Sequence, residues 1–392
     1  MNYILFDTQK SRVSLLPLSY TRPISEMRIG IMTIKEKWEK YLNTTCSYLT
    51  ESYLQEKFPV KYSQNNIYIK GNILPNQEIV EQIKGLKNGE ALYKENQLIA
   101  FCSEHKILFD NELNGFNKIK LNIKFSQIIF PWDIFRLNGQ EIENDYKLLT
   151  KGKTSAPISK TNRIIGENIF IEEGAEMEFA TINAKNAYIY IGKNAVVMEG
   201  VLIRGSFALG ENAVVKMGAK IYGPTTAGPG SKIGGEINNS VIFANSNKGH
   251  DGFLGNSVLG EWCNIGANSD TSNLKNNYAE VRVWNYANEG FARTGLQFCG
   301  LIMGDHSKCG INTMFNTGTI VGVNANIYGA GFPRNFIPSF SWGGALGFKE
   351  YKLNKAFEVN DVVMKRRNKI FDEKEQNILK KVFEISQKHR RF

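Results

Sequence analysis

The sequence predicts an α/β domain followed by a solenoid of short parallel strands and turns, with a helix near the end of the chain. An aliphatic residue that recurs every six positions predicts the solenoid. These residues are Ile191, Val197, Ile203, Leu209, Val215, Ile221, Ala227 and Ile233, followed later by Met303, Cys309, Phe315, Val321 and Ile327. Neither an amphipathic helix nor an alternating strand has a period of six, whereas a coil of strands and tight turns does. Chance alternation in a glycine-rich β protein is the alternative, and eight consecutive repeats in the first run disfavour it.

The remaining segments have local patterns of their own. Residues 3–6 and 68–70 have the composition of strands, and residues 29–42 carry helical spacing, which predicts an α/β domain over residues 1–150. Residues 151–162 are polar and turn-prone, as in a linker. The solenoid is expected over 163–345, and a C-terminal extension with an amphipathic helix over 346–392. Breaks in the repeat between Met177 and Ile191 and between Ile233 and Leu259 predict loops that protrude from the coil.

Composition limits the classes of protein to which the chain can belong. With 392 residues, 42% hydrophobic and 22% charged, the sequence is typical of a soluble protein with more than one domain. No apolar run approaches the roughly 18 residues of a membrane span, and the N-terminus does not resemble a secretory signal. The five cysteines are scattered without a CxxC pair, which predicts free thiols in a reducing compartment, the cytoplasm.

The net charge of +10 indicates anionic partners or a basic solvated surface. Because the basic residues are dispersed, we expect phosphorylated small molecules rather than nucleic acid, and no membrane partner.

Histidine is scarce, with His105, His250, His306 and His389 in the whole chain. His250 lies in a glycine-rich stretch next to Lys248, which would attract an anion, and Asp251, which would orient the ring. A general base near neutral pH is most often histidine. We therefore predict His250 as a catalytic base, with His306 as the alternative. A structural or surface histidine is the competing interpretation.

Motifs around His250 carry a family resemblance. Residues 246–250, 253–255, 259–261 and 264–267 resemble the acetyltransferase domain of bifunctional N-acetylglucosamine-1-phosphate uridylyltransferase/glucosamine-1-phosphate acetyltransferase. The resemblance implies a left-handed parallel β-helix, a homotrimer and acetyl-CoA as the acetyl donor. It also implies that His250 deprotonates the sugar amine, and that Asn264, Ala267 and Asn273 line the substrate pocket.

This chain departs from that family in two ways. Phe253 stands where the family usually has tyrosine, and the stretch 223–229 lacks the family's phosphate-binding arginine. The basic residues that we predict as replacements are Lys232, Lys248, Lys275, Arg282 and Arg293.

A second motif lies near the N-terminus. Residues 14–23 resemble half of the sugar nucleotidyltransferase signature, in which a glycine-rich loop wraps the nucleotide triphosphate. Here residues 6–12 contain no glycine, and Asn72 stands where the family has an aspartate that holds Mg²⁺. The predicted nucleotide-binding residues are Asp7, Arg12, Arg22, Arg28 and Asn72, and the predicted Mg²⁺ ligands are Asp133 and Asp145. Structural salt bridges are the alternative role for the arginines.

Taken along nearly its full length, the chain resembles a divergent bacterial form of this bifunctional enzyme. The resemblance implies acetylation of glucosamine-1-phosphate and uridylyl transfer from UTP to give UDP-N-acetylglucosamine. One alternative is a nucleotidyltransferase for another sugar or nucleotide, with a β-helix used only for oligomerisation. The other alternative is a catalytically silent regulatory or scaffold homologue.

Overall fold

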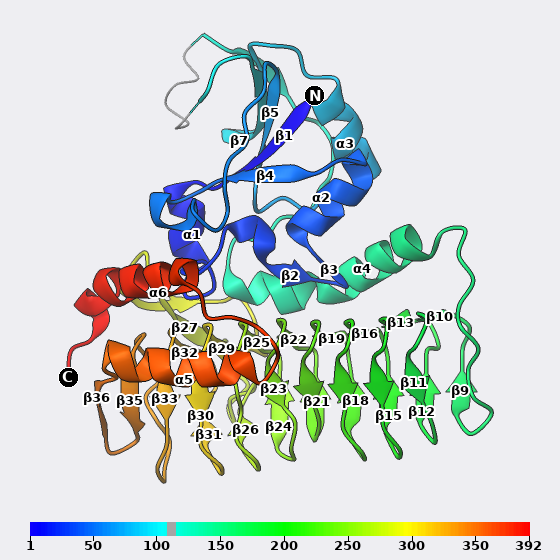
Figure 1. The fold of residues 1–392 in the computed structure, drawn as a ribbon, viewed down its shortest axis with the longest axis vertical. Helices are drawn as coiled ribbons and strands as arrows, with labels where there is room; N and C mark the ends of the chain where they lie inside the picture. The colour runs from blue at the N-terminus through cyan, green and yellow to red at the C-terminus, as the bar shows by residue number, and fades with distance from the viewer. Residues whose placement is uncertain (108–114) are drawn as a thin grey trace. The chain divides into compact units, whose positions relative to one another are not determined.

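The computed structural model describes residues 1–107 and 115–392, which divide into two compact units (Figure 1). The first unit contains residues 1–15, 21–27 and 32–130, and the second contains residues 16–20, 28–31 and 131–392. The predicted succession of an α/β domain, a parallel β-solenoid and C-terminal helices is confirmed. The handedness of the coil stays a prediction.

The first unit is built on a mixed sheet in the strand order β4-β1-β5-β7-β6-β8. The strands are β1 (Asn2–Phe6), β4 (Cys46–Leu49), β5 (Asn66–Lys70), β6 (Glu90–Lys94), β7 (Gln97–Ser103) and β8 (Asn117–Lys120). Strand β1 pairs in parallel with β4 and β5, whereas β7 runs antiparallel to β5 and β6. Phe101 stacks on Tyr68 with ring centroids 4.4 Å apart, in a buried cluster on the sheet. The strands predicted at 3–6 and 68–70 are therefore present.

Helices α1 (Gln9–Ser14), α2 (Ile34–Leu42) and α3 (Gln77–Lys84) belong to this unit, and the short β3 (Met32–Thr33) precedes α2. The helix predicted over residues 29–42 begins only at Ile34, because Thr33 caps it. The Thr33 side chain accepts from Glu36 N, and the Glu36 side chain accepts from Thr33 N. This reciprocal capping box satisfies two donors that the helix leaves open.

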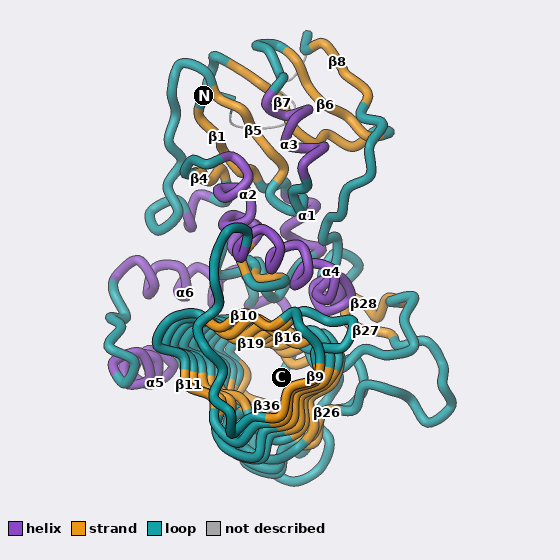
Figure 2. The backbone as a smooth tube through the Cα atoms, turned by 90° about the vertical axis from the view of Figure 1, so that its right-hand side faces the viewer, coloured by secondary structure: helices purple, strands orange, loops and turns teal. Residues whose placement is uncertain are grey.

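The second unit is a coil of parallel strands with three faces, seen along its axis in Figure 2. The first face holds β10 (Ile169–Ile171), β13 (Ile189–Ile191), β16 (Phe207–Leu209), β19 (Thr225–Ala227), β22 (Val241–Ile242), β25 (Val258–Leu259), β29 (Ile302–Met303), β32 (Ile320–Val321) and β34 (Phe336–Ile337). The second face holds β11 (Glu176–Met177), β14 (Val196–Val197), β17 (Val214–Val215), β20 (Lys232–Ile233) and β23 (Asn247–Lys248), then β30 (Lys308–Cys309), β33 (Asn326–Ile327), β35 (Ser341–Gly344) and β36 (Gly347–Glu350). The third face holds β9 (Arg163–Ile165), β12 (Thr181–Asn183), β15 (Leu202–Arg204), β18 (Lys220–Tyr222), β21 (Glu236–Asn238) and β24 (Phe253–Gly255), and β26 (Asp270–Thr271) pairs with β31 (Met314–Phe315).

The strand register explains the six-residue repeat. Ile189 pairs with Phe207 and Phe207 with Thr225, so one turn of the coil takes 18 residues in this region. Three faces share each turn, and each face with its corner takes six residues and contributes one aliphatic side chain to the interior. All eight aliphatic residues of the first run are buried in one continuous core. Asparagine occupies many corners with positive φ, as at Asn194 and Asn212, a conformation that asparagine tolerates better than most residues.

The second predicted loop is wrong. Between Ile233 and Leu259 the chain stays in the coil, and its turns become shorter: Ile233 pairs with Lys248 and Val241 with Val258. The long insertion lies later, because Val258 pairs with Ile302 on the next turn. It contains an antiparallel hairpin of β27 (Arg282–Asn285) and β28 (Gly290–Arg293). A deletion and an insertion both interrupt a repeat, and the spacing alone did not distinguish them.

The helix α4 (Pro131–Thr150) belongs to the second unit, together with the short β2 (Arg28–Ile29). Its apolar side, with Ile142 and Tyr146, packs in a cluster with Ala208 and Tyr190 of the first face. The first compact unit therefore ends at Phe130, before the domain limit predicted at residue 150.

Two C-terminal helices, α5 (Leu353–Lys365) and α6 (Glu373–Ile385), complete the second unit. Asn360 of α5 donates to Asn324 Oδ1 at a corner of the coil, and Phe383 of α6 packs edge-on against Phe340. The predicted amphipathic helix corresponds to α6, in which Ile378 and Val382 are buried. In the described chain no helix is both long and apolar enough to cross a membrane.

Candidate active sites in the two units

The first unit contains a cavity of about 1300 Å³ where β1, β4 and β5 end. Asp7 follows β1, Thr50 follows β4, and Lys70 is the last residue of β5; all three line the cavity. The carboxyl ends of neighbouring parallel strands are the usual place for a ligand in an open α/β sheet. This cavity is the candidate nucleotide site.

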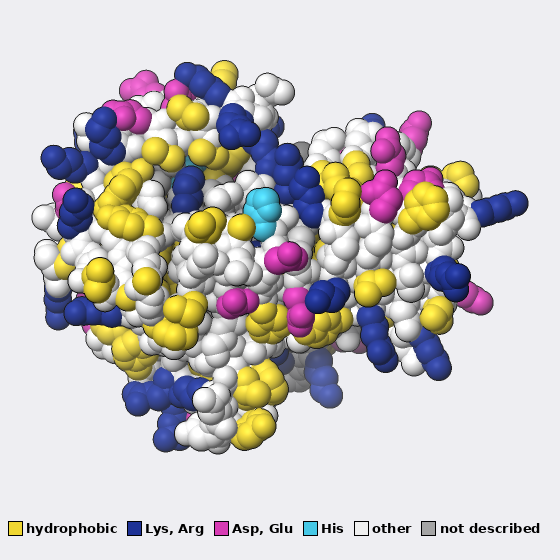
Figure 3. All heavy atoms as spheres, turned by 90° about the horizontal axis from the view of Figure 1, so that it is seen from below, with side chains coloured by type: hydrophobic (Ala, Val, Ile, Leu, Met, Phe, Trp, Pro, Cys, Tyr) yellow, Lys and Arg dark blue, Asp and Glu magenta, His cyan; other side chains and the backbone are white. Residues whose placement is uncertain are grey.

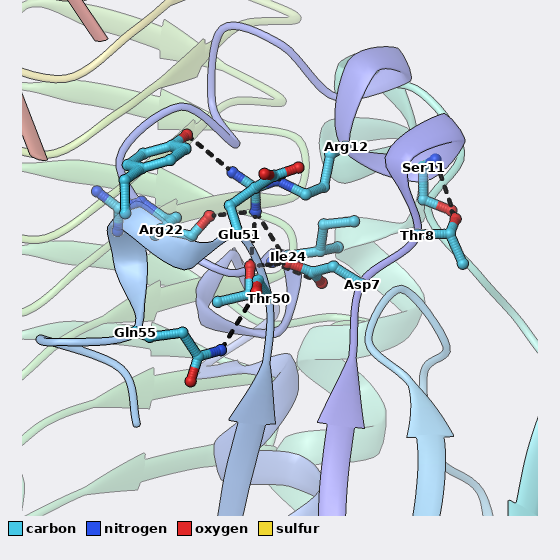
Figure 4. Close-up of polar contacts among 10 residues, drawn as sticks. Asp7, Thr8, Ser11, Arg12, Arg22, Ile24, Thr50, Glu51 and Gln55 are labelled. Atoms are coloured by element: carbon cyan, nitrogen blue, oxygen red, sulfur yellow. Dashed lines mark hydrogen bonds and ion pairs between the residues drawn. The ribbon is translucent and has the colours of Figure 1, made fainter. Parts of the chain in front are cut away.

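Asp7 and Arg12 form a closed network in the lining (Figure 4). Arg12 Nη1 donates to Asp7 Oδ2 at 2.9 Å, to Thr50 Oγ1 at 3.0 Å and to the Arg22 carbonyl at 3.1 Å. Arg12 Nη2 donates to the Tyr53 hydroxyl, and Ile24 N donates to Asp7 Oδ1 at 3.2 Å. Burial raises the pKa of Asp7, and the Arg12 guanidinium opposes that rise. Arg12 is therefore chiefly an internal partner of Asp7, which is the structural salt-bridge role left open by the sequence.

Asn72 differs from this closed network. Its side chain is 3% exposed, and Nδ2 donates to the Ile128 carbonyl at 2.8 Å. Its Oδ1 has no hydrogen-bond partner among the described residues, although Asn72 lines the cavity. A buried amide oxygen without a partner carries a desolvation cost that a ligand donor would relieve.

The structure separates the other predicted nucleotide-binding residues. Arg22 is buried and is not among the described residues of the cavity lining. Arg28 belongs to the second unit, where its guanidinium donates to the Ile31 carbonyl. The lysines on the described lining are Lys10, Lys70 and Lys94. We did not predict Lys70 or Lys94 as binding residues, although Lys70 lies two residues before Asn72, which we did predict.

The described residues do not fit a protein-held Mg²⁺. Asp133 and Asp145 lie twelve residues apart on α4 of the second unit, about 18 Å along a helix axis. Asp133 pairs with Arg136 at 2.8 Å, and Asp145 accepts from Ile31 N at 2.8 Å. No cluster of three histidine, cysteine or acidic residues suited to a metal occurs in the described parts of the chain. The predicted ligand pair is therefore wrong, because helix geometry keeps the two carboxylates apart.

The second candidate site surrounds His250, at the corner between the second and third faces. His250 is exposed, and its ring makes no hydrogen bond with the described residues. Asn247 pairs with Asn264, and Asn268 N donates to the Asp251 carbonyl, so Ala267 lies beside His250 on the next turn. Gly235 occupies the turn on the other side, where a Cβ would lie 2.6 Å from the His250 carbonyl oxygen. Small residues thus occupy the positions aligned with His250 on both neighbouring turns.

Phe253 and Asn273 lie together just beyond this corner. Both would contact a side chain placed at Gly255, with Phe253 Cζ at 2.5 Å and Asn273 Nδ2 at 2.6 Å from a Cβ there. Asn273 also donates to Asn256 Oδ1 at 2.8 Å, and Asp270 accepts from Phe253 N at 2.7 Å. The structure therefore brings the predicted residues His250, Ala267 and Asn273 to one region of the coil.

Two further predicted residues lie on the second face. Asn264 accepts from Asn247 Nδ2 at 3.3 Å, and Asn247 in turn accepts from Arg367 of the α5–α6 turn at 2.8 Å. Lys232 is on the strand next to Asn247. Burial lowers the pKa of Lys232, and the nearby cations Arg367, Lys216 and Arg366 lower it further. An anion at this place would be attracted by several positive charges.

The other predicted cations make their contacts within the insertion and not with His250 or Lys232. Arg282 donates to the Phe291 carbonyl within the hairpin, Arg293 lies 3.8 Å from Glu280, and Lys275 donates to the Glu280 carbonyl. These residues belong to the insertion that the sequence analysis did not locate. More widely, basic, acidic and apolar side chains are interspersed on the face drawn in Figure 3.

Lys248 requires a correction. It was predicted to face an anionic substrate, but its side chain is 1% exposed and lies in the interior of the coil. Strand register places it in line with Ile233, so it points inward as the aliphatic residues do. His306, the alternative base, is also buried and stacks on Trp262 with ring centroids 6.2 Å apart. Exposure therefore favours His250.

The comparisons with known proteins give the family of each part of the chain. Residues 3–154 match a family model described as sugar nucleotidyl transferase. The uncharacterized acetyltransferase YaiX of Escherichia coli is 30% identical over 193 residues, covering 49% of this chain and 75% of that protein. The chain belongs to this acetyltransferase family. It therefore combines a sugar nucleotidyl transferase domain with an acetyltransferase-type β-solenoid in a family of transferases.

The bifunctional protein GlmU of Methanococcus aeolicus is 30% identical over 230 residues, covering 56% of this chain and 46% of that protein. The chain thus spans about half the length of the GlmU relatives that it matches. Among solved structures, Arabidopsis UDP-N-acetylglucosamine acyltransferase has a TM-score of 0.24 at 16% identity, over 54% of this chain and 80% of that one. That likeness is too low to support an argument. The resemblance to the bifunctional family is confirmed by the two sequence comparisons.

Proposed function

We propose that the second unit transfers an acetyl group from acetyl-CoA to the amine of glucosamine-1-phosphate. We propose further that the first unit joins the product to UTP, giving UDP-N-acetylglucosamine and pyrophosphate. The observation that carries the proposal is that His250 is exposed at a corner where the aligned positions on the neighbouring turns are the small residues Gly235 and Ala267. The acetyltransferase name of one relative and the sugar nucleotidyl transferase family model support these two kinds of activity.

Each step of acetyl transfer can be assigned to residues at the corner. The amine nitrogen of the sugar attacks the thioester carbonyl carbon, and the imidazole of His250 accepts the proton that the amine loses. The C–S bond then breaks, the acetyl group stays on nitrogen as an amide, and the CoA thiolate takes the proton from the His250 imidazolium and leaves as a thiol. Phe253 and Asn273 would line the sugar, and Lys232 and Arg367 would attract the phosphates of a substrate.

In the first unit a sugar-phosphate oxygen would attack the α-phosphorus of UTP, and the P–O bond to pyrophosphate would break. Such reactions depend on positioning and charge neutralisation. We propose that Lys10 and Lys70 on the cavity lining neutralise the phosphate charge, and that Asn72 Oδ1 accepts a hydrogen bond from the substrate. No step is assigned to a metal, because the described residues do not offer a set of ligands.

We also propose that the protein is a homotrimer in the cytoplasm. The third face exposes Ile165 and Leu202 beside a groove of about 870 Å³, and burial of such side chains against a second copy would be favourable. All five cysteines are free and buried, as expected in a reducing compartment. Light scattering at micromolar concentration should give three times the mass of the chain, and a monomer mass would contradict the trimer.

A second candidate function is acetyl transfer alone. It is favoured by the Asp7–Arg12 network, which engages Arg12 of the cavity lining with protein groups. One assay separates the two candidates: purified protein is given acetyl-CoA, glucosamine-1-phosphate and UTP, and free thiol and pyrophosphate are followed separately. Release of thiol without pyrophosphate supports acetyl transfer alone, and release of neither contradicts both.

A further inference from the structure

A lysine side chain lies inside the solenoid, directly before the corner that carries His250. Along the second face, strand register aligns Val197, Val215, Ile233 and Lys248 as successive inward residues. Charged side chains are almost never fully buried unless they are paired. The placement of Lys248 in this aliphatic column therefore requires a partner for its ammonium group.

Its partners are backbone carbonyl groups of the corner itself. Lys248 Nζ donates to the His250 carbonyl at 2.5 Å, to the Asp251 carbonyl at 3.2 Å and to the Gly234 carbonyl at 3.4 Å. Asp251 O also accepts from Asn268 N on the next turn. By contrast, the donor to the His250 carbonyl oxygen in the described structure is Lys248 Nζ.

The shortened turn explains why the His250 carbonyl needs a side-chain donor. Two residues, Gly234 and Gly235, separate β20 from β21, whereas four residues, 249–252, separate β23 from β24 on the next turn. The shorter corner has fewer N–H groups to offer to the longer one. Its Gly235 lies directly against the His250 carbonyl, since a Cβ there would be 2.6 Å from the oxygen. The ammonium of Lys248 supplies the donor that the shorter corner lacks.

We propose that Lys248 is a positioning residue, whose buried ammonium holds the His250 and Asp251 carbonyls and so fixes the corner that presents the His250 ring. The inference rests on the proposed acetyl transfer for its catalytic consequence, but the effect on the corner does not depend on it. A general base must lie within hydrogen-bond reach of its proton, and small displacements reduce rate steeply. Lys248 touches no reacting atom in this scheme.

The test is Lys248→Met, which keeps the length of the side chain and removes the donor. Methionine suits a site between Ile233 and Ile265, so the midpoint of thermal unfolding should be maintained or raised. We expect kcat for acetyl transfer to fall by on the order of 10²-fold, with KM for the amino sugar changed by less than about threefold. Hydrogen exchange of the amides at 249–252 should become faster. Lys248→Gln, which keeps an N–H donor, should give intermediate values, and it provides a second test if the methionine variant does not fold.

Lys308→Met is the matched control. Lys308 Nζ donates to the His306 carbonyl at 2.8 Å, and burial lowers the pKa of both lysines to about 8. The control removes a half-buried ammonium that holds a different backbone carbonyl, and it should leave exchange at 249–252 unchanged. Unchanged kcat in Lys248→Met, or unchanged exchange at 249–252, would overturn the inference. If the unmodified protein releases no CoA thiol, the proposed function fails, and the exchange measurement still decides whether Lys248 holds the corner.

Discussion

At the scale of single residues, exposure and hydrogen bonding separate groups that have the same chemistry. His250 is exposed at a corner, whereas His306 is buried against Trp262. Lys10 is exposed, whereas Lys248 lies inside the coil. Residue type alone does not distinguish the members of each pair, whereas the surroundings of each side chain do.

The role of His250 can be measured directly. If His250 is the general base, His250→Ala should lower acetyl transfer by roughly 10²–10⁴-fold without changing the unfolding midpoint. His105→Ala, in the first unit, is the control and should retain full CoA thiol release. Normal turnover in the His250 variant, together with a loss in His306→Ala, would assign the base to His306.

Arg12 and Lys10 should respond differently to removal of their charges. Arg12→Met leaves the buried carboxylate of Asp7 without its ion-pair partner, so we expect the first unit to lose about 3–5 kcal/mol of stability. Lys10→Met should leave the unfolding midpoint unchanged and weaken UTP binding measured by calorimetry.

UTP affinity should change little when EDTA replaces Mg²⁺. A loss of UTP binding in EDTA would show that a metal is required despite the missing ligands.

Lys248 should also make stability depend on pH. Burial lowers its pKa from an ordinary value of 10.5 to about 8. Between pH 8 and pH 10.5 the unfolded chain therefore holds a proton that the folded chain has released. The free energy of unfolding must rise with pH in this window, by at most about 1.4 kcal/mol per pH unit.

Comparison with Lys248→Met isolates this contribution. The thiol of Cys263, whose pKa burial raises, and the amine of Lys308 titrate in both proteins and cancel in the difference. Chemical denaturation at pH 7.5, 8.5 and 9.5 should show the wild type gaining stability relative to the variant. A constant difference would mean that Lys248 does not titrate in this range.

At the scale of elements, the corners of the coil set the environment of the site. Gly235 and Gly218 occupy corners on successive turns with φ of +72° and +70°. A Cβ at Gly235 would lie 2.6 Å from the His250 carbonyl oxygen, whereas one at Gly218 would meet nothing within 4 Å. The two glycines therefore share a left-handed backbone conformation and differ in what a side chain there would contact.

This pair makes a matched test of the corner. Gly218→Ala should cost about 1–2 kcal/mol from the left-handed backbone alone, and acetyl transfer should be unchanged. Gly235→Ala should cost more and should also lower acetyl transfer, because the His250 carbonyl must move away. Equal effects on activity would indicate that the shorter corner does not position His250.

At the scale of the whole molecule, the chain joins two units whose candidate sites use different physical means. The cavity of the first unit lies at the ends of parallel strands, where Lys10 of α1, Lys70 at the end of β5 and the Asn72 amide line it. The site of the second unit lies on a corner of a rigid coil, where neighbouring turns hold each residue. A coil of this kind places side chains by strand register, which is kept when corners differ in length, as where Ile233 pairs with Lys248 on a shortened turn.

Much of the fold could be predicted because the six-residue repeat is a local property that each turn repeats. The buried positions of Ile191, Val197 and Ile203 follow from spacing alone. The position of the hairpin at 282–293 could not be predicted, because a missing residue and an added segment interrupt a repeat in the same way. His250 and Asn273 could be selected from their motifs, whereas Lys70 had no motif that distinguished it from other lysines.

The architecture follows from the amino-acid pattern: the solenoid, the strands of the first unit, the free thiols and a prominent histidine on a glycine-rich turn. These features depend on interactions between residues close in the chain or repeated along it. The three-dimensional packing was needed to show that Arg12 is engaged by Asp7, that α4 packs on the coil and that Lys248 points inward. Each of these outcomes depends on groups from distant segments or adjacent turns, whose burial and pairing energies no local pattern records.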